Sequence, residues 1–203
     1  MILNELNQDQ TIKVPDHIKG LIFDMDGTLV NSIPVHYNAW IEACSKYKAS
    51  FSYDYFVSLT GQPVLELSKG IITKFGLKVS ATQLVDEKEQ LVEKNLNKVE
   101  LIQPVMRVIR AHDGKLPMAV GTGASKKMAT RLLSETGIIH QFQTIVTSDD
   151  VDRYKPHPDT FLKAAQEINV LPQDCLVFED GQLGIEAALA AGMTVVDVKP
   201  FYE

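Results

Sequence analysis

The sequence predicts an α/β fold in which a doubly wound parallel sheet carries a small helical insertion after its first strand. Three observations lead to this prediction. Short apolar runs recur along the chain, helical stretches separate the later runs, and one segment near the N-terminal end reads as helices without an obvious strand. Strands that alternate with helices are typical of a parallel sheet covered by helices.

Five apolar runs have the composition of buried parallel strands. They are Leu21–Phe23, Met118–Val120, Thr144–Val146, Leu176–Phe178 and Thr194–Val198. The helices predicted between the later runs are Ser125–Thr136, Pro158–Ile168 and Ile185–Ala191. Gly137 and Gly192 directly follow two of these helices, and glycine is the typical residue just past a helix end.

The helical segment predicts how the chain is divided. Residues 32–97 are interrupted by Thr60-Gly61-Gln62-Pro63 and by Gly76, and we expect them to form a helical cap. Residues 1–31 and 98–203 are then expected to form the α/β core that carries the chemistry. A chain of 203 residues is long enough for one such core with a modest insertion.

Composition excludes some partners. Apolar residues make up 45% and charged residues 23% of the chain, which is ordinary for a soluble globular protein. The net charge of −6 argues against nucleic-acid binding, which usually requires a basic surplus. It does not argue against a small anionic substrate, because a few local cations can hold a phosphate.

The chain shows no targeting signal that we can identify. Residues 1–19 are rich in Asn, Gln and Asp and do not resemble a signal peptide. No apolar run approaches the ~20 residues that cross a bilayer. We therefore expect a cytoplasmic protein without membrane contact. Cys44 and Cys175 fit neither a metal-binding spacing nor a disulfide framework, and Cys175 is expected to be a buried core thiol.

Two aspartates close the first apolar run. Asp24 and Asp26 are one residue apart, and Gly27 follows them. In a strand the two side chains would point to the same face, because side chains alternate. Neighbouring carboxylates repel unless a cation lies between them or one of them holds a proton. Asp24 and Asp26 are therefore either solvated turn residues or the centre of a metal-dependent site.

Three further polar groups stand at the ends of later runs. Thr122 precedes Gly123 and a predicted helix, Lys155 lies in Lys-Pro-His-Pro after the third run, and Glu179-Asp180 closes the fourth run. Ligands of open parallel sheets bind beyond the carboxyl ends of the strands. These side chains suit phosphoryl transfer: a carboxylate nucleophile, carboxylate ligands for Mg²⁺, and a hydroxyl and an ammonium for the phosphate.

Each of these groups also has a purely structural interpretation. Thr122 alone would be a helix cap, Lys155 a solvated surface lysine, and Glu179-Asp180 a pair that complements a helix dipole. The occurrence of all four groups at strand ends favours the functional interpretation.

The four motifs together resemble the haloacid dehalogenase superfamily of phosphotransferases. They are Asp-Met-Asp-Gly-Thr, Val-Gly-Thr-Gly, Lys-Pro-His-Pro-Asp-Thr-Phe and Phe-Glu-Asp-Gly, in this order. The cap after the first motif resembles that of the β-phosphoglucomutase-like branch. Met-Ala-Val-Gly-Thr-Gly and the tail Gly-Ile-Glu-Ala-Ala-Leu-Ala-Ala-Gly-Met are similar to bacterial sugar-phosphate phosphatases of the fructose-1-phosphate type. The resemblance implies a Rossmann-like core.

The resemblance also implies roles for these residues. Asp24 would be the nucleophile, and Asp26 the acid that protonates the leaving alcohol and then the base that activates water. Mg²⁺ would be held by the carboxylates of Asp24 and Asp180 and the backbone carbonyl of Asp26, with Glu179 supporting the site directly or through water. Thr122 and Lys155 would bind the phosphoryl group, with backbone donors around Gly123 and Ala124. These roles follow the motifs position by position.

The cap would choose the substrate by closing over the core. His36 and Trp40 share one helix face, and the matching positions in this branch line the site beside the nucleophile. The structural alternative makes Trp40 part of the cap core and His36 a rim residue. Lys88 matches a cap lysine of this branch.

The reaction class follows from two features. An acid at Asp26 suits phosphoryl chemistry rather than dehalogenation. The mutase has an arginine soon after its cap glycine, whereas Gly61 here is followed by Gln62-Pro63-Val64-Leu65, with no basic residue until Lys69. We therefore expect a Mg²⁺-dependent phosphatase of a small phosphorylated sugar or sugar acid, present as a monomer or weak dimer. A β-phosphoglucomutase-type isomerase and a non-catalytic phosphate-binding protein are the alternatives.

Overall fold

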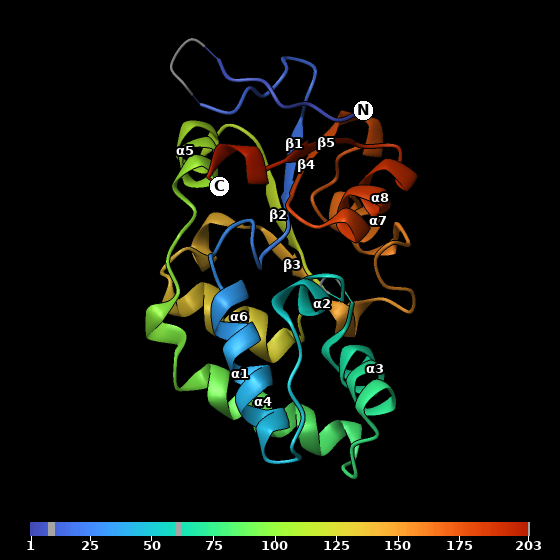
Figure 1. Ribbon diagram of the computed structural model, residues 1–203. Coiled ribbons are helices and arrows are strands. Elements are labelled where there is room, and N and C mark those ends of the chain that lie inside the picture. The colour runs from blue at the N-terminus through green and yellow to red at the C-terminus, as the bar shows by residue number, and fades with distance from the viewer. Residues whose placement is uncertain (8–10, 60–61, 203) are drawn as a thin grey trace.

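A sheet of five parallel strands in the order β3-β2-β1-β4-β5 forms the centre of the molecule (Figure 1). The computed structural model describes residues 1–7, 11–59 and 62–202. The strands are β1 (Gly20–Phe23), β2 (Met118–Gly121), β3 (Thr144–Val146), β4 (Cys175–Glu179) and β5 (Thr194–Asp197). The predicted parallel sheet is confirmed, and every predicted strand matches within one residue at each end.

Helices cover both faces of this sheet. They are α5 (Gln103–His112), α6 (Lys126–Glu135), α7 (Asp159–Glu167) and α8 (Gln182–Ala190). Short 3₁₀ helices lie between these elements or at their ends: η1 (Leu96–Lys98) before α5, η2 (Ile139–Gln141), η3 (Ser148–Asp150), η4 (Pro172–Asp174), and η5 (Lys199–Phe201) after β5. Leu21 and Phe23 pack with side chains of α5 and α6, whereas Ile22 packs with α7 and α8. Because both faces are covered, the strands are apolar at nearly every position.

Two helices differ from the prediction. α5 was not expected, although its buried Val105, Met106, Val108 and Ile109 form an apolar stripe of helical spacing. α8 begins three residues before the predicted Ile185. Its first turn includes Gly184, a poor helix former. A Cβ on Gly184 would lie 1.6 Å from Glu179 Oε1, so the glycine makes room for that carboxylate.

Residues between β1 and α5 form the predicted helical segment. Its helices are α1 (Ile33–Ser45), α2 (Tyr53–Val57), α3 (Val64–Phe75) and α4 (Ala81–Glu93). They lie together at the end of the sheet opposite both chain termini (Figure 1). They share a hydrophobic cluster that includes Trp40, Phe56 and Leu84. Within residues 32–59 and 62–97 no strand is present, as predicted.

The two connections to this helical segment lie side by side. Asn31 N donates to Glu100 O at 2.8 Å, and Ile102 N donates to Leu29 O at 3.0 Å. The predicted cap boundaries, before residue 32 and after residue 97, lie next to these paired connections. The division of the chain into a core and a cap stays a prediction. Thr60 and Gly61, which the sequence suggested as an interruption, lie outside the described residues.

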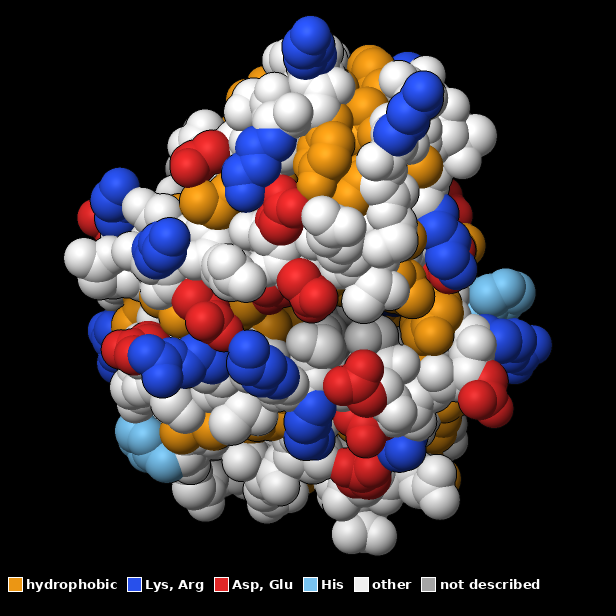
Figure 2. Space-filling view, turned by 90° about the horizontal axis from the view of Figure 1, so that it is seen from below, with side chains coloured by type: hydrophobic (Ala, Val, Ile, Leu, Met, Phe, Trp, Pro, Cys, Tyr) orange, Lys and Arg blue, Asp and Glu red, His pale blue; other side chains and the backbone are white. Residues whose placement is uncertain are grey.

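Surface and buried features bear on the remaining predictions. Figure 2 shows the face formed by the end of the molecule that carries α1, α3 and α4, where Lys and Arg side chains are interspersed with Asp and Glu. No helix in the described part of the chain combines the length and apolar character needed to cross a bilayer.

Cys44 and Cys175 are buried free thiols, and burial raises their pKa to about 11 and about 12.

The N-terminal residues extend the sheet beyond β5. Leu3 N donates to Val195 O at 2.8 Å, and Val195 N donates to Met1 O at 2.9 Å. Ile2 and Val195 form a parallel bridge.

Candidate active site

Asp24 and Asp26 lie just beyond β1, and their side chains contact different residues. Asp24 Oδ1 accepts a hydrogen bond from Lys155 Nζ at 2.6 Å. Asp26 Oδ1 accepts one from Ser32 Oγ and lies 3.3 Å from His36 Nε2. The alternation expected from a strand was wrong here, because β1 ends at Phe23 before either aspartate. The solvated-turn alternative was wrong for Asp24, whose side chain is buried.

A buried lysine joins two of the predicted carboxylates. Lys155 Nζ donates to Asp24 Oδ1 at 2.6 Å and to Glu179 Oε1 at 2.8 Å. The alternative of a solvated surface lysine was therefore wrong, since Lys155 is 3% exposed. The other oxygen of Glu179, Oε2, accepts from Gly181 N at 2.6 Å. Both oxygens of this carboxylate thus have donors, which a buried charge requires.

The buried charges shift one another's pKa. Burial alone would lower the pKa of Lys155, but the nearby carboxylates of Asp24 and Glu179 outweigh it and the pKa is raised. Burial raises the pKa of Asp24 well above its usual value, against the opposing charge of Lys155. Burial and the charge of Glu179 raise the pKa of Asp180 to about 7. A further cation beside these carboxylates would therefore favour their ionised forms.

Three carboxylates are close enough to bind one cation. Asp24, Glu179 and Asp180 each offer an oxygen, and these atoms lie within 4.8 Å of one another. Hard oxygen ligands of this type are those that Mg²⁺ prefers. Thr28 Oγ1 donates to Asp180 Oδ1 at 3.2 Å and orients it. The carboxylate of Asp26 is not a member of this group, which is compatible with the backbone-carbonyl role that the resemblance implied.

Gly27 allows this close packing. Its φ of +89° lies in the left-handed region, and a Cβ there would lie 2.4 Å from Asp180 Oδ2. A side chain at this position would displace Asp180 and strain the backbone. The glycine after the two aspartates is therefore required by the geometry of the carboxylate group.

The loop after β2 places Thr122 and Gly123 in the lining of a cavity that Asp24, Glu179 and Asp180 also line. Thr122 Oγ1 accepts from Ala124 N at 3.1 Å. Thr122 is not the helix cap that the structural alternative suggested, because Ser125 is the N-cap of α6 and its side chain accepts from Met128 N. Thr122 is buried at the base of this loop. A hydroxyl and nearby helix-start N–H groups are suitable donors for a phosphate.

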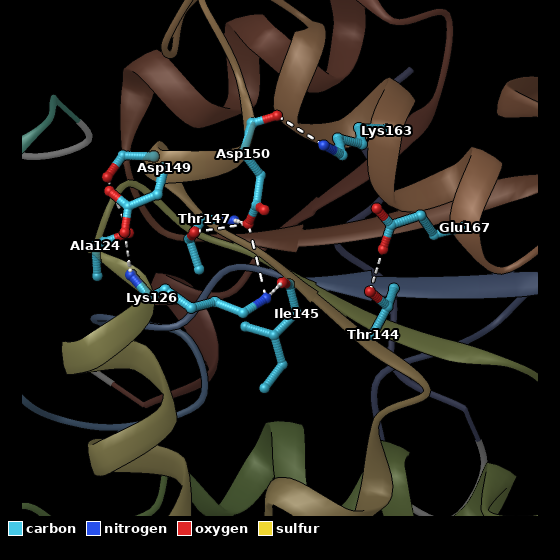
Figure 3. Close-up of polar contacts among 10 residues, drawn as sticks. Ala124, Lys126, Thr144, Ile145, Thr147, Asp149, Asp150, Lys163 and Glu167 are labelled. Carbon is cyan, nitrogen blue, oxygen red and sulfur yellow. Dashed lines mark hydrogen bonds and ion pairs between the residues drawn. The ribbon is translucent and has the colours of Figure 1, made fainter.

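Polar contacts beyond β3 hold this loop and the following segment together (Figure 3). Asp149 Oδ2 accepts from Lys126 N at 2.8 Å, and Lys126 Nζ donates to Ile145 O at 2.6 Å. Asp150 Oδ2 accepts from Thr147 Oγ1 at 2.7 Å. Lys163 Nζ donates to Asp150 O at 2.8 Å. The start of α6 and the segment that leads to Lys155 are thereby fixed relative to β3.

One cavity joins the carboxylates to the helical segment. On the core side it is lined by Asp24, Asp26, Thr122, Gly123, Ala124, Ser125, Met128, Glu179, Asp180 and Gly181. On the cap side it is lined by Ile33, His36, Trp40, Phe56, Gln62, Val64, Leu67, Lys88 and Glu89. Trp40 also packs in the cap cluster, so the structural and the functional interpretations of this residue both describe its position.

Several residues of the site were not identified from the sequence. Ser32, which contacts Asp26, follows it by six residues and carried no separate signal. Phe56, Val64 and Leu67 read as ordinary cap-core residues, and Glu89 as one charge among many on an amphipathic helix. The packing of α2, α3 and α4 turns these four cap residues toward the cavity.

Comparisons with known proteins agree with this arrangement. The haloacid dehalogenase-like hydrolase family matches residues 21–198. Fructose-1-phosphate phosphatase YqaB of Escherichia coli (strain K12) is 40% identical over 181 residues, which cover 89% of this chain and 96% of the relative. β-Phosphoglucomutase of Bacillus subtilis (strain 168) is 28% identical over 191 residues, which cover 89% and 83%.

Solved structures agree as well. β-Phosphoglucomutase from Clostridium difficile superposes with a TM-score of 0.80 at 24% identity, and the match covers 88% of this chain and 83% of that one. This likeness shows that the fold is shared. The chain therefore belongs to the haloacid dehalogenase-like hydrolases and is a hydrolase of the phosphatase type.

Proposed function

We propose that this chain is a Mg²⁺-dependent phosphatase that hydrolyses small sugar phosphates through a phosphoryl-aspartate on Asp24. The observation that carries the proposal is the buried group in which Lys155 bridges Asp24 and Glu179 beside Asp180. The family match and a relative named as a fructose-1-phosphate phosphatase support it. Asp24, Asp180 and the backbone carbonyl of Asp26 would hold Mg²⁺, with Glu179 supporting them; the bound ion would neutralise phosphate charge.

The first chemical step uses Asp24 as the nucleophile. A carboxylate oxygen of Asp24 attacks phosphorus, and the bond between phosphorus and the sugar oxygen breaks. Asp26 donates a proton to this leaving oxygen, so that the sugar departs as an alcohol. Lys155 and Thr122, with N–H groups near Gly123, hold the phosphoryl oxygens in line with the attack.

The second step restores the enzyme. The ionised Asp26 takes a proton from water, the water oxygen attacks phosphorus, and the bond to Asp24 breaks to release inorganic phosphate. Burial raises the pKa of Asp26, but His36 and Ser32 outweigh it and lower the pKa overall. The free site thus holds Asp26 in the form that accepts a proton. A phosphoryl dianion beside Asp26 raises its pKa again and favours the proton-donating form.

A phosphate-release assay across sugar phosphates tests the proposal. Parent protein with Mg²⁺ is expected to release phosphate from small sugar monophosphates. Asp24→Asn is expected to lower kcat at least about 10⁴-fold, as loss of a catalytic nucleophile does, with folding checked by circular dichroism. Folded parent protein without turnover on any sugar phosphate would overturn the proposal.

The mutase remains the rival enzyme because a β-phosphoglucomutase is among the relatives. Gln62 is a neutral polar residue on the cap side of the cavity, which we call the cap wall. α3 begins at Val64 without an arginine in its first turn. A second phosphate therefore lacks a guanidinium partner in α3. Formation of glucose 6-phosphate from β-glucose 1-phosphate faster than phosphate release would favour the mutase. The cytoplasmic location and the monomeric or weakly dimeric state remain predictions from the sequence.

A further inference from the structure

We propose that Glu89 is a specificity-determining residue, an inference that rests on the function proposed above. Glu89 neutralises Lys88 in the cap wall of the cavity. The site then selects phosphate esters of uncharged sugars over phosphorylated sugar acids and bisphosphates. The proposal narrows the substrate class from a sugar or sugar acid to a sugar without a second anionic group.

The position of the pair is the first part of the argument. Lys88 and Glu89 are consecutive residues of α4, and both line the cavity that Asp24 and Asp26 line from the core side. The Lys88 side chain is 3% exposed, and its Nζ lies 5.7 Å from the centre of the Trp40 ring. Lys88 therefore faces the substrate space rather than bulk water. Its positive charge also acts on Asp26, whose pKa it helps to lower.

The charge balance of the wall is the second part. A buried ammonium alone would attract a carboxylate or a second phosphate of the substrate. Here Lys88 Nζ donates to Glu89 Oε1 at 2.8 Å, so the positive charge already has a partner. His36 Nε2 lies 3.3 Å from Asp26 Oδ1, and Gln62 is neutral. Among the described lining residues of the cap, Lys88 is the one lysine or arginine, and Glu89 already pairs with it.

The remaining properties of the wall indicate what it accepts. Ile33, Phe56, Val64 and Leu67 provide apolar surface beside Trp40. An ionised carboxylate accepts hydrogen bonds and cannot donate them. Glu89 can therefore bind sugar hydroxyls, which donate, and repels carboxylates and phosphates, which do not. A like charge placed against the wrong ligand is an effective means of discrimination.

A matched substrate pair tests the proposal. Glucose 6-phosphate and 6-phosphogluconate share a carbon chain and a phosphate position, and the second carries a carboxylate at its other end. Parent protein is expected to show the higher kcat/KM on glucose 6-phosphate. Glu89→Gln keeps the size and removes the charge. It is expected to raise the ratio of kcat/KM for the acid over the sugar about tenfold, which corresponds to about 1.4 kcal/mol.

Two control variants separate charge in the cavity from other effects. Glu89→Asp keeps the negative charge and is expected to keep the preference of the parent. Glu66→Gln removes a carboxylate of α3 that is exposed and pairs with Lys69 outside the cavity, and it is expected to leave the ratio unchanged. A tenfold change in Glu66→Gln would mean that overall charge, and not Glu89, sets the preference.

The outcomes distinguish this inference from the proposed function. If parent protein hydrolyses both substrates but Glu89→Gln changes both kcat/KM values by the same factor, the role of Glu89 is wrong and the phosphatase stands. The role of Glu89 is also wrong if the parent protein hydrolyses the sugar acid phosphate with a kcat/KM equal to or higher than that for the sugar phosphate. If folded parent protein hydrolyses no sugar phosphate at all, the proposed function fails first.

Discussion

The core wall and the cap wall of the cavity are built from different kinds of contact. On the core side, a buried ammonium holds Asp24 and Glu179 in place through two short hydrogen bonds. On the cap side, apolar side chains predominate, and the charged pair Lys88–Glu89 neutralises itself. The core wall is thus organised for charge chemistry before any ligand binds, whereas the cap wall is the side that we propose to discriminate between substrates.

Buried charges of the core wall and exposed charges outside the cavity should respond differently to substitution. Removing a charge from the core wall leaves other buried charges without partners, which is strongly destabilising. Removing a charge at the exposed boundary between cap and core leaves its partner in water, which changes stability little. The following experiments compare these cases, from the largest expected change to the smallest.

Lys155→Met should have the largest effect on stability. It leaves the buried carboxylates of Asp24 and Glu179 facing each other without the cation that joins them. Breaking a buried ion pair in this way costs about 3–5 kcal/mol of unfolding free energy. Urea denaturation in the presence of EDTA measures it. A loss no larger than that of an exposed control such as Lys127→Met would contradict the importance of the bridge.

Stability without divalent metal should depend on pH through Asp180. Its pKa is raised from 3.8 to about 7 in the folded chain, so the folded state binds more protons than the unfolded state between these values. Stability is then lost as the pH rises through this range, by up to about 1.4 kcal/mol per pH unit for one group.

Added Mg²⁺ should reverse this trend, because the ion favours the ionised carboxylates. The rise in Tm on adding Mg²⁺ is expected to be larger at about pH 8 than at about pH 5.5, as measured by thermal denaturation against an EDTA reference. An equal rise at both values would mean that Mg²⁺ does not bind at Asp180.

Glu93→Gln should have the smallest effect. Glu93 of α4 pairs with Lys127 of α6 at 2.8 Å across the boundary between cap and core, and the two side chains are 41% and 82% exposed. Exposed pairs contribute about 0.2–1 kcal/mol, so urea denaturation is expected to place the variant within about 1 kcal/mol of the parent. A larger loss would show that this contact holds the cap against the core.

The core wall could be predicted from the sequence because its requirements are local. Each reactive side chain lies at or beyond the carboxyl end of a strand, and parallel strands bring their carboxyl ends to one edge. Thr122, Lys155 and Glu179 could therefore be assigned to one site without knowledge of the strand order. The separate orientations of Asp24 and Asp26 could not be predicted, because they depend on where β1 ends and on the contacts of Ser32 and His36.

The cap wall could be predicted only in part. His36 and Trp40 share a helix face, and both line the cavity. Glu89 could not be distinguished from the neighbouring charges of α4, because a periodic pattern does not say which polar residue faces the cavity. α5 was not predicted, because it precedes the second strand, outside the region where strands and helices alternate regularly.

The short N-terminal pairing with β5 has a consequence for handling the protein. An unpaired outer strand offers backbone groups to other chains and promotes aggregation. Here the outward N–H of Val195 donates to Met1 O, and its carbonyl accepts from Leu3 N, so neither group is free to pair with another chain. A truncation that removes residues 1–4 would open that edge, and the shortened protein is expected to self-associate at high concentration.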